Sequence, residues 1–146
     1  MFKRYLNIKY KKNGRDFDYC DCYGICYLFN KHELEIDLPI YLDDPVENQE
    51  QIDALFNKKK SDFKKVKLGK ECEGDIISFN IKGLPTHVGV VLQKGLMLHI
   101  ISGETAKIES YTTNKWINRI KRPLKIHNDL IDTNTLKEEL IKCYPD

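Results

Sequence analysis

The stretch from Asp21 to Tyr27 contains the residues best suited to chemistry. Asp is a preferred N-cap, so Asp21 predicts a helix that begins at Cys22 and runs toward Asn30. Cys22 then lies in the first turn, where the positive end of the helix dipole favours the thiolate and is expected to lower the pKa of the thiol. The thiolate is the form that attacks carbonyl carbons. Cys22 is therefore the candidate nucleophile.

A nucleophile of this kind needs a base, and the chain offers four histidines: His32, His87, His99 and His127. Three runs rich in β-branched residues are separated by Gly and Pro clusters and predict an antiparallel meander, at residues 76–81, 87–92 and 96–101. His87 and His99 then lie on adjacent strands and can act as base and orienter. The other two histidines fall outside this pattern and are expected at the surface.

The elements that position these groups follow from the hydrophobic pattern. The helix after Asp21 has an apolar stripe at the spacing of a buried face, formed by Ile25, Cys26, Leu28 and Phe29. Residues 11–18 are polar and predict a loop. Residues 30–45 are acidic, and Pro39 and Pro45 favour a loop over the catalytic face. Its acids either meet a cationic group of the substrate or remain solvated.

The rest of the chain predicts one α+β domain and a tail. Residues 46–63 have a helical pattern that Asp44 can cap. A further strand is expected at residues 105–108 and a final strand at 121–126, which makes about five in all. Between them a short helix bears Trp116, with Ser110 or Thr113 as its cap. The domain covers residues 1–126, and residues 127–146 form a C-terminal tail with one amphipathic helix.

Composition narrows the class of protein. The chain has 146 residues, of which 41% are hydrophobic and 32% charged, as in soluble globular domains. The net charge is +2, which gives no reason to expect a nucleic-acid partner. No apolar run approaches the roughly 20 residues of a transmembrane helix, so we expect no membrane insertion. Residues 1–6 lack the apolar core and cleavage site of a secretory signal.

Five cysteines are an odd number, which argues against a complete disulfide framework. Cys20, Cys22 and Cys26 are close in sequence, and a zinc site that joins them to His87 and His99 is an alternative. Their spacing lacks the usual Cys-x2-Cys knuckle, so we expect neither a metal nor an organic cofactor. Cys26 is expected to be a small core residue.

Four motifs in this order resemble the NlpC family of papain-like cell-wall peptidases. They are Asp-Cys-Tyr-Gly at residues 21–24, Gly-Asp-Ile-Ile-Ser-Phe at 74–79, His-Val-Gly-Val at 87–90 and Leu-His at 98–99. Tyr10 stands where the family has a tyrosine beside the nucleophile. The resemblance spans Tyr10 to Ile126. Two departures are Asn13, where the family often has glycine, and Tyr23, where most members outside phages have serine.

The resemblance implies a papain-like fold, with the nucleophile helix packed on the small antiparallel sheet. It also implies a cysteine endopeptidase that cleaves amide bonds of the peptidoglycan stem peptide. Cys22 would be the nucleophile, His87 the base and His99 the orienter. The Cys22 backbone N–H and the Tyr10 hydroxyl would stabilise the oxyanion.

The chain is most similar to the short family members encoded with phage tail genes, through Leu-Pro-Ile-Tyr at residues 38–41 and Trp116 before the basic segment 119–122. This likeness implies a protein made in the host cytoplasm, assembled with tail-tip proteins into the virion and carried to the cell wall at infection. Residues 58–67 and 127–146 would be its docking surfaces. The alternatives are a structural tail-tip subunit that retains the fold, and an acyl or amide transferase that uses the same Cys–His site.

Overall fold

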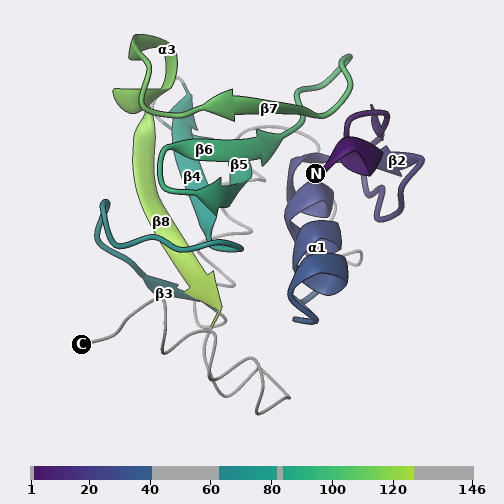
Figure 1. Ribbon diagram of the computed structural model, residues 1–146. Helices are drawn as coiled ribbons and strands as arrows, with labels where there is room; N and C mark the ends of the chain where they lie inside the picture. Colours follow the sequence, from purple (N-terminus) through teal and green to yellow (C-terminus); the bar gives the residue numbers. More distant parts are fainter. Residues whose placement is uncertain (1, 41–62, 82–83, 127–146) are drawn as a thin grey trace.

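The computed structural model describes residues 2–40, 63–81 and 84–126, which form a helix packed on an antiparallel sheet (Figure 1). The helix is α1 (Cys22–Glu33), and the sheet has the strand order β3-β8-β4-β5-β6-β7. Its strands are β3 (Phe63–Lys65), β4 (Ile76–Ile81), β5 (Leu84–Gln93), β6 (Leu96–His99), β7 (Lys107–Ser110) and β8 (Ile120–Ile126). The smaller elements are η1 (Lys3–Tyr5), β1 (Lys9–Tyr10), β2 (Tyr19–Cys20) and α3 (Asn114–Ile117).

The meander predicted from the β-branched runs is confirmed as β4, β5 and β6, although β5 begins earlier, at Leu84, and β6 ends at His99. The predicted final strand is β8, and the strand predicted at residues 105–108 is β7, shifted by two residues. The predicted number of about five strands was too small, because the prediction missed β3 and the parallel pair of β1 and β2. The predicted helix at 46–63 lies outside the described residues except at Phe63, which begins β3. The predicted tail at 127–146 also lies outside them.

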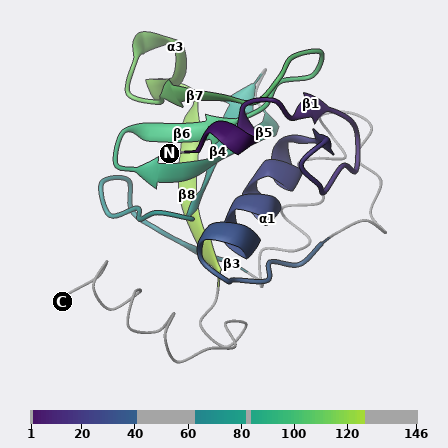
Figure 2. The same ribbon diagram turned by 45° about the vertical axis from the view of Figure 1, so that its right-hand side comes forward.

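The apolar stripe of α1 is buried as the sequence predicted, and it packs on β5 and β6 (Figure 2). Ile25, Cys26 and Phe29 are fully buried in one core cluster with strand residues such as Val90 and Leu98. Burying each aliphatic or aromatic side chain of this size contributes about 1.5–3 kcal/mol. This packing holds the N-terminus of α1 in a fixed position beside the sheet.

A second apolar cluster is formed by alternate residues of the same strands, so it lies on the opposite face of the sheet. Tyr111 and Trp116 cover it from the segment that follows β7, and Trp116 belongs to α3. Thr113 is the residue before α3, one of the two caps that the sequence suggested, although its side chain accepts no capping hydrogen bond. This cluster surrounds the two histidines described below.

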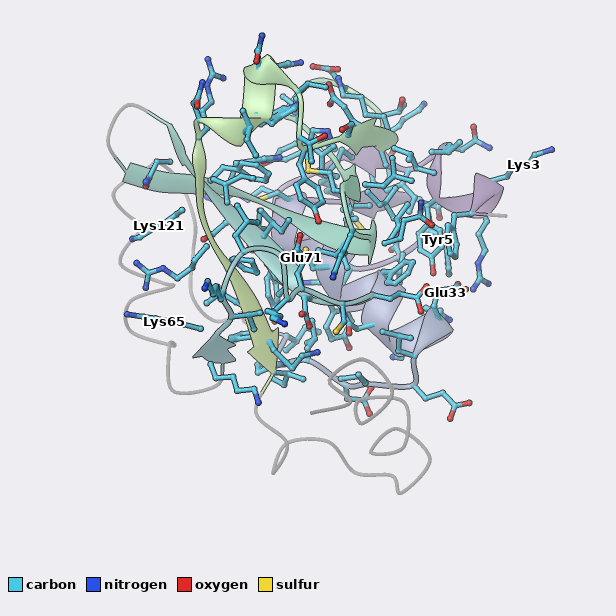
Figure 3. The ribbon with its side chains drawn as sticks, turned by 60° about the vertical axis from the view of Figure 1, so that its left-hand side comes forward. Lys3, Tyr5, Glu33, Lys65, Glu71 and Lys121 are labelled. Carbon is cyan, nitrogen blue, oxygen red and sulfur yellow. The ribbon has the colours of Figure 1, made fainter. Side chains whose placement is uncertain are left out.

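The N-terminal segment crosses the C-terminal end of α1 and then reaches the segment that precedes β7. The Tyr5 hydroxyl donates to Glu33 Oε2 at 2.6 Å, and the two side chains lie together in Figure 3. Further on, the Tyr10 backbone N–H donates to the Glu104 carbonyl at 3.2 Å, just before β7. No helix in the described part of the chain has both the length and the apolar character needed to cross a bilayer.

Candidate active site

The N-terminus of α1 is fixed by the carboxylate of Asp21. Its Oδ1 accepts from the Gly24 backbone N–H at 2.7 Å, which confirms the predicted N-cap. The same oxygen pairs with the Arg15 guanidinium at 2.7 Å, and Oδ2 accepts from the Asn13 backbone N–H at 2.9 Å. The carboxylate therefore ties the loop at residues 13–15 to the first turn of α1. Cys22, the first residue of α1, is therefore held in place by the loop and by the first helical turn together.

The glycine of the Asp-Cys-Tyr-Gly motif is explained by the closeness of this loop. A Cβ on Gly24 would lie 2.1 Å from the carbonyl oxygen of Gly14, and a Cβ on Gly14 would lie 2.5 Å from that of Tyr19. Both distances are far below contact between non-bonded atoms. The two glycines thus allow the loop and the nucleophile helix to touch through their backbones.

Cys22 lies at the edge of β5, next to the residue that follows His87. The Val88 and Tyr23 backbone N–H groups donate toward its sulfur. The register Val90↔Leu98 puts Gly89 opposite His99, the last residue of β6. At Val88, therefore, β5 has no β6 residue beside it, and this edge of β5 is open to α1. As a whole residue Cys22 is half-buried. Its position beside β5 brings the predicted nucleophile to the strand that bears the predicted base.

Burial raises the pKa of the Cys22 thiol to about 12, and the negative charge of Asp21 adds to this effect. The two backbone N–H groups act in the opposite direction but do not outweigh it. The sequence-based expectation of a lowered pKa was therefore wrong, because desolvation exceeds the stabilisation from the helix terminus. Burial likewise lowers the pKa of His87 to about 3. At neutral pH both groups are uncharged.

His87 and His99 are joined directly, as the meander predicted. His87 Nε2 lies 2.9 Å from His99 Nδ1, and both residues are buried, His99 completely. Gly89 makes this approach possible, since a Cβ there would lie 3.2 Å from the Cβ of His99. The glycine of the His-Val-Gly-Val motif therefore allows β6 to bring its histidine close to β5.

A residue that the sequence analysis missed completes this chain of side chains. Glu109 Oε1 lies 2.8 Å from His99 Nε2. Glu109 belongs to β7, where it pairs with Met97 of β6, so its side chain lies diagonally across from His99. The sequence did predict a strand at residues 105–108, directly before Glu109. The pairing of this strand with β6, however, depends on the turn at residues 102–106, which the apolar pattern does not determine.

Trp116 covers the two imidazoles. Its ring stacks on that of His87, with centroids 5.7 Å apart and planes at 26°, and meets that of His99 edge-on at 5.2 Å. Phe79 contacts His87 from β4, at a centroid distance of 5.7 Å. These aromatic groups keep water from the bond between the histidines, and their exclusion of water contributes to the low pKa of His87.

Tyr10 lies close enough to Cys22 for the two groups to interact electrostatically. The pKa of the Tyr10 hydroxyl is raised to about 12, mainly by burial and to a smaller extent by Cys22 and Asp21. The hydroxyl therefore keeps its proton at neutral pH and can donate a hydrogen bond. Of the four residues predicted from the sequence, Tyr10 ends β1, Cys22 begins α1, His87 lies on β5 and His99 ends β6.

The other thiols near the nucleophile differ from it. Cys20 is fully buried and donates to the Asp16 carbonyl at 3.2 Å, and burial raises its pKa to about 12. Cys26 is fully buried in the core, as the sequence predicted.

His32 is exposed and packs on Phe17. Across the residues the structure describes, no three His, Cys, Asp or Glu side chains are arranged to hold a metal ion.

A cysteine at the start of a helix, packed on an antiparallel sheet that carries two bonded histidines, is the papain-like arrangement. The model of the NlpC/P60 family matches residues 7–125. The chain belongs to this family. That result confirms the fold and the family expected from the four motifs.

Two solved structures share the fold. The NlpC/p60 domain of the peptidoglycan hydrolase SagA has 18% sequence identity and a TM-score of 0.58, over 85% of this chain and 92% of that one. A protein of Staphylococcus aureus subsp. aureus Mu50, described as similar to a lipoprotein of the NLP/P60 family, has 17% identity and a TM-score of 0.58. That match covers 86% of this chain but 39% of the other. No curated protein matches the chain.

Proposed function

We propose that this chain is a cysteine peptidase that hydrolyses amide bonds in the peptide stems of bacterial cell wall. The observation that carries the proposal is the position of Cys22 at the N-terminus of α1, beside the strand that bears the bonded pair of His87 and His99. Membership of the NlpC/P60 family and the likeness to a domain of a peptidoglycan hydrolase support the choice of substrate.

The reaction follows from the charges of the resting groups. Cys22 and His87 start uncharged, so His87 takes the thiol proton as the sulfur attacks the amide carbonyl carbon. The Cys22 backbone N–H and the Tyr10 hydroxyl donate to the oxyanion of the tetrahedral intermediate. His87 then gives its proton to the leaving amine as the C–N bond breaks. Water, deprotonated by His87, releases the acyl group and restores the thiol.

Digestion of purified peptidoglycan, followed by mass analysis of the fragments, tests this proposal. The wild-type protein should release fragments with new free amino and carboxyl ends, each bond cleaved adding one water. Cys22→Ala should release none while retaining the thermal unfolding curve of the wild type. Cys20→Ser is the matched control and should keep most of the activity. Equal loss in both variants would contradict the assignment of the nucleophile.

The same acyl-enzyme can be released by an amine instead of water, which would make the protein a transferase. Digestion in the presence of a labelled amine separates the two reactions. Hydrolysis gives free carboxyl ends, and transfer gives fragments that carry the label. We expect free carboxyl ends to predominate.

We further propose that the protein acts at the distal end of a phage tail, where it reaches the wall at infection. The support is the Leu-Pro-Ile-Tyr stretch, of which Leu38 is buried and the Pro39 carbonyl accepts from the Tyr23 hydroxyl at 2.5 Å. The other support is Trp116 before the basic segment 119–122, and in this chain its ring stacks on that of His87. Purified virions should contain the protein, and antibodies should label the tail tip. Its absence from washed virions would contradict this location.

Residues 58–67 and 127–146 are the proposed docking segments for neighbouring tail proteins. Of the first segment the structure describes residues 63–67, in which Lys64, Lys65 and Lys67 are exposed and Phe63 is buried. Deletion of residues 127–146 should reduce incorporation into virions more than hydrolysis by the isolated protein. Virions that contain the protein but infect equally well with Cys22→Ala would point instead to a structural subunit.

A further inference from the structure

We infer that Glu109 is a positioning residue that, acting through His99, keeps the proton of His87 on Nε2 and so leaves His87 Nδ1 free to accept the proton of Cys22. The inference rests on the proposed function only in taking Cys22 and His87 as the reacting pair. It concerns a residue outside the predicted Cys–His–His set. It also gives the set a defined direction of proton transfer.

The position of each proton follows from the donors and acceptors along the hydrogen bonds from Glu109 to His87. An ionised carboxylate can only accept, so the contact of 2.8 Å to Glu109 Oε1 requires a proton on His99 Nε2. A neutral imidazole carries one proton, which makes His99 Nδ1 an acceptor. The contact of 2.9 Å between His99 Nδ1 and His87 Nε2 then requires a proton on His87 Nε2. In a neutral His87 the lone pair is left on Nδ1.

Glu109 keeps the charge that this chain of contacts needs. Partial burial opposes its ionisation, but the indole N–H of Trp116, the bond to His99 and the charge of Lys115 together lower the pKa of its carboxyl. Lys115 Nζ lies 3.6 Å from Oε2, and Lys107 Nζ lies 3.9 Å from Oε1. The indole nitrogen forms no hydrogen bond of ordinary geometry, so its effect is through space.

His99 in turn stays neutral. Its complete burial lowers its pKa, which the bond to Glu109 opposes and the charges of Lys107 and Lys115 reinforce. A protonated His99 would direct an N–H at His87 Nε2 and leave the His87 proton on Nδ1. His87 could not then accept from a thiol. Burial and the two lysines therefore favour the productive arrangement at neutral pH.

Without the carboxylate, His99 is free to carry its proton on either nitrogen. Whenever the proton is on Nδ1, it points toward His87 Nε2 and the same unproductive arrangement results. The Glu109 side chain is 25% exposed, so replacing it leaves little buried volume unfilled. Its loss should therefore reduce the reactivity of Cys22 while leaving the protein folded.

Nitrogen-15 NMR of the imidazole rings tests the inference directly, because the two tautomers give different chemical shifts. In the wild-type protein both His87 and His99 should carry their proton on Nε2. In Glu109→Leu a population with the proton on Nδ1 should appear in both rings. Glu104→Gln is the matched control, since the Glu104 side chain is 50% exposed and pairs with Lys107 at 3.4 Å. It should give wild-type tautomers. Wild-type rings protonated on Nδ1 would overturn the inference.

The rate of alkylation of Cys22 by iodoacetamide provides a second readout that requires no cell-wall substrate. Glu109→Leu should slow it by about 10- to 100-fold, the range found when carboxylates that orient metal-bound histidines are removed. Glu109→Gln retains an accepting oxygen, so its alkylation rate should lie between those of the wild type and Glu109→Leu. A Glu109→Leu protein with wild-type tautomers and wild-type alkylation would refute the role of Glu109, as would a Glu109→Gln protein that reacts as slowly as Glu109→Leu. Failure of the wild type to cut peptidoglycan would refute the proposed function alone.

Discussion

Cys22 and His87 rest in their uncharged forms because the protein excludes water from them. A helix terminus stabilises a nearby anion by about 0.3–1 kcal/mol. The shift of the Cys22 pKa from 9.0 to about 12 corresponds to roughly 4 kcal/mol in the opposite direction. The helix N-terminus alone therefore does not produce a thiolate in this site. In the proposed mechanism the proton therefore passes to His87 during the attack.

The protonation state of Cys22 can be measured through the ultraviolet absorbance of the thiolate. Because its pKa is raised, the thiol keeps its proton at neutral pH. The difference spectrum between the wild type and Cys22→Ala should then show no thiolate between about pH 5 and 9 and should show it only as the pH approaches 12. Thiolate absorbance at pH 7 that disappears on acidification would instead indicate a preformed ion pair with His87.

The two histidines should differ in their contribution to the rate. In the proposed mechanism His87 transfers the proton, a role that contributes about 10²- to 10⁴-fold to catalysis. His99 only orients His87 in that mechanism, so His99→Ala should cost less. We expect turnover of cell-wall peptide to fall further in His87→Ala than in His99→Ala, with similar unfolding temperatures for the two. The reverse order would mean that the two roles are exchanged.

At the scale of elements, the parts predicted correctly are those with strong local signals. Asp21 marks the start of α1, the apolar stripe marks its buried face, and the β-branched runs mark the meander. The parts that were missed depend on contacts distant in sequence. β3 is a strand of three residues that forms by pairing with β8, and the contact of Glu109 with His99 depends on the register between β6 and β7.

The contact between α1 and the loop at residues 13–15 is sensitive to a single methyl group. Gly24→Ala would normally stabilise a helix by about 1 kcal/mol. Here the new Cβ would lie 2.1 Å from the Gly14 carbonyl oxygen, so we expect it to destabilise the protein by about 1–3 kcal/mol. Urea unfolding measures the change. Lys31→Ala, on the exposed side of α1, is the control and should stay within about 0.5 kcal/mol of wild type.

A Gly24→Ala protein that is more stable than the wild type would contradict the close backbone contact. The same variant should also lose activity, because the loop and Cys22 are held by the one carboxylate of Asp21. Loss of activity without loss of stability would show that the loop adjusts and moves the site with it.

At the scale of the whole molecule, a buried ion pair joins two neighbouring strands of the sheet, β8 and β4. Lys125 Nζ of β8 lies 2.6 Å from Oδ1 of Asp75, which directly precedes β4. Each side chain is 3% exposed. Asp75 Oδ2 also accepts from the Cys72 backbone N–H at 2.9 Å. The carboxylate thus fixes the turn before β4 and the end of β8 together.

Removal of the cation should be costly, because it leaves a buried carboxylate without its partner in this pair. Lys125→Met is expected to lower the free energy of unfolding by about 3–5 kcal/mol. Lys121→Met is the matched control, since Lys121 points away from the sheet (Figure 3) and should change stability by less than about 0.5 kcal/mol. Denaturant unfolding of both variants checks the prediction. Equal stabilities would mean that the pair contributes little to holding β4 and β8 together.

The central claim is that the Cys22 sulfur carries out the reaction, and partial alkylation tests it most directly. The protein is treated with increasing iodoacetamide in the presence of EDTA, and each sample is divided for peptide mapping and for digestion of peptidoglycan. We predict that the remaining activity falls in proportion to the fraction of Cys22 labelled, and that EDTA alone has no effect. Activity that persists when Cys22 is fully labelled, or that EDTA abolishes and zinc restores, would contradict the assignment.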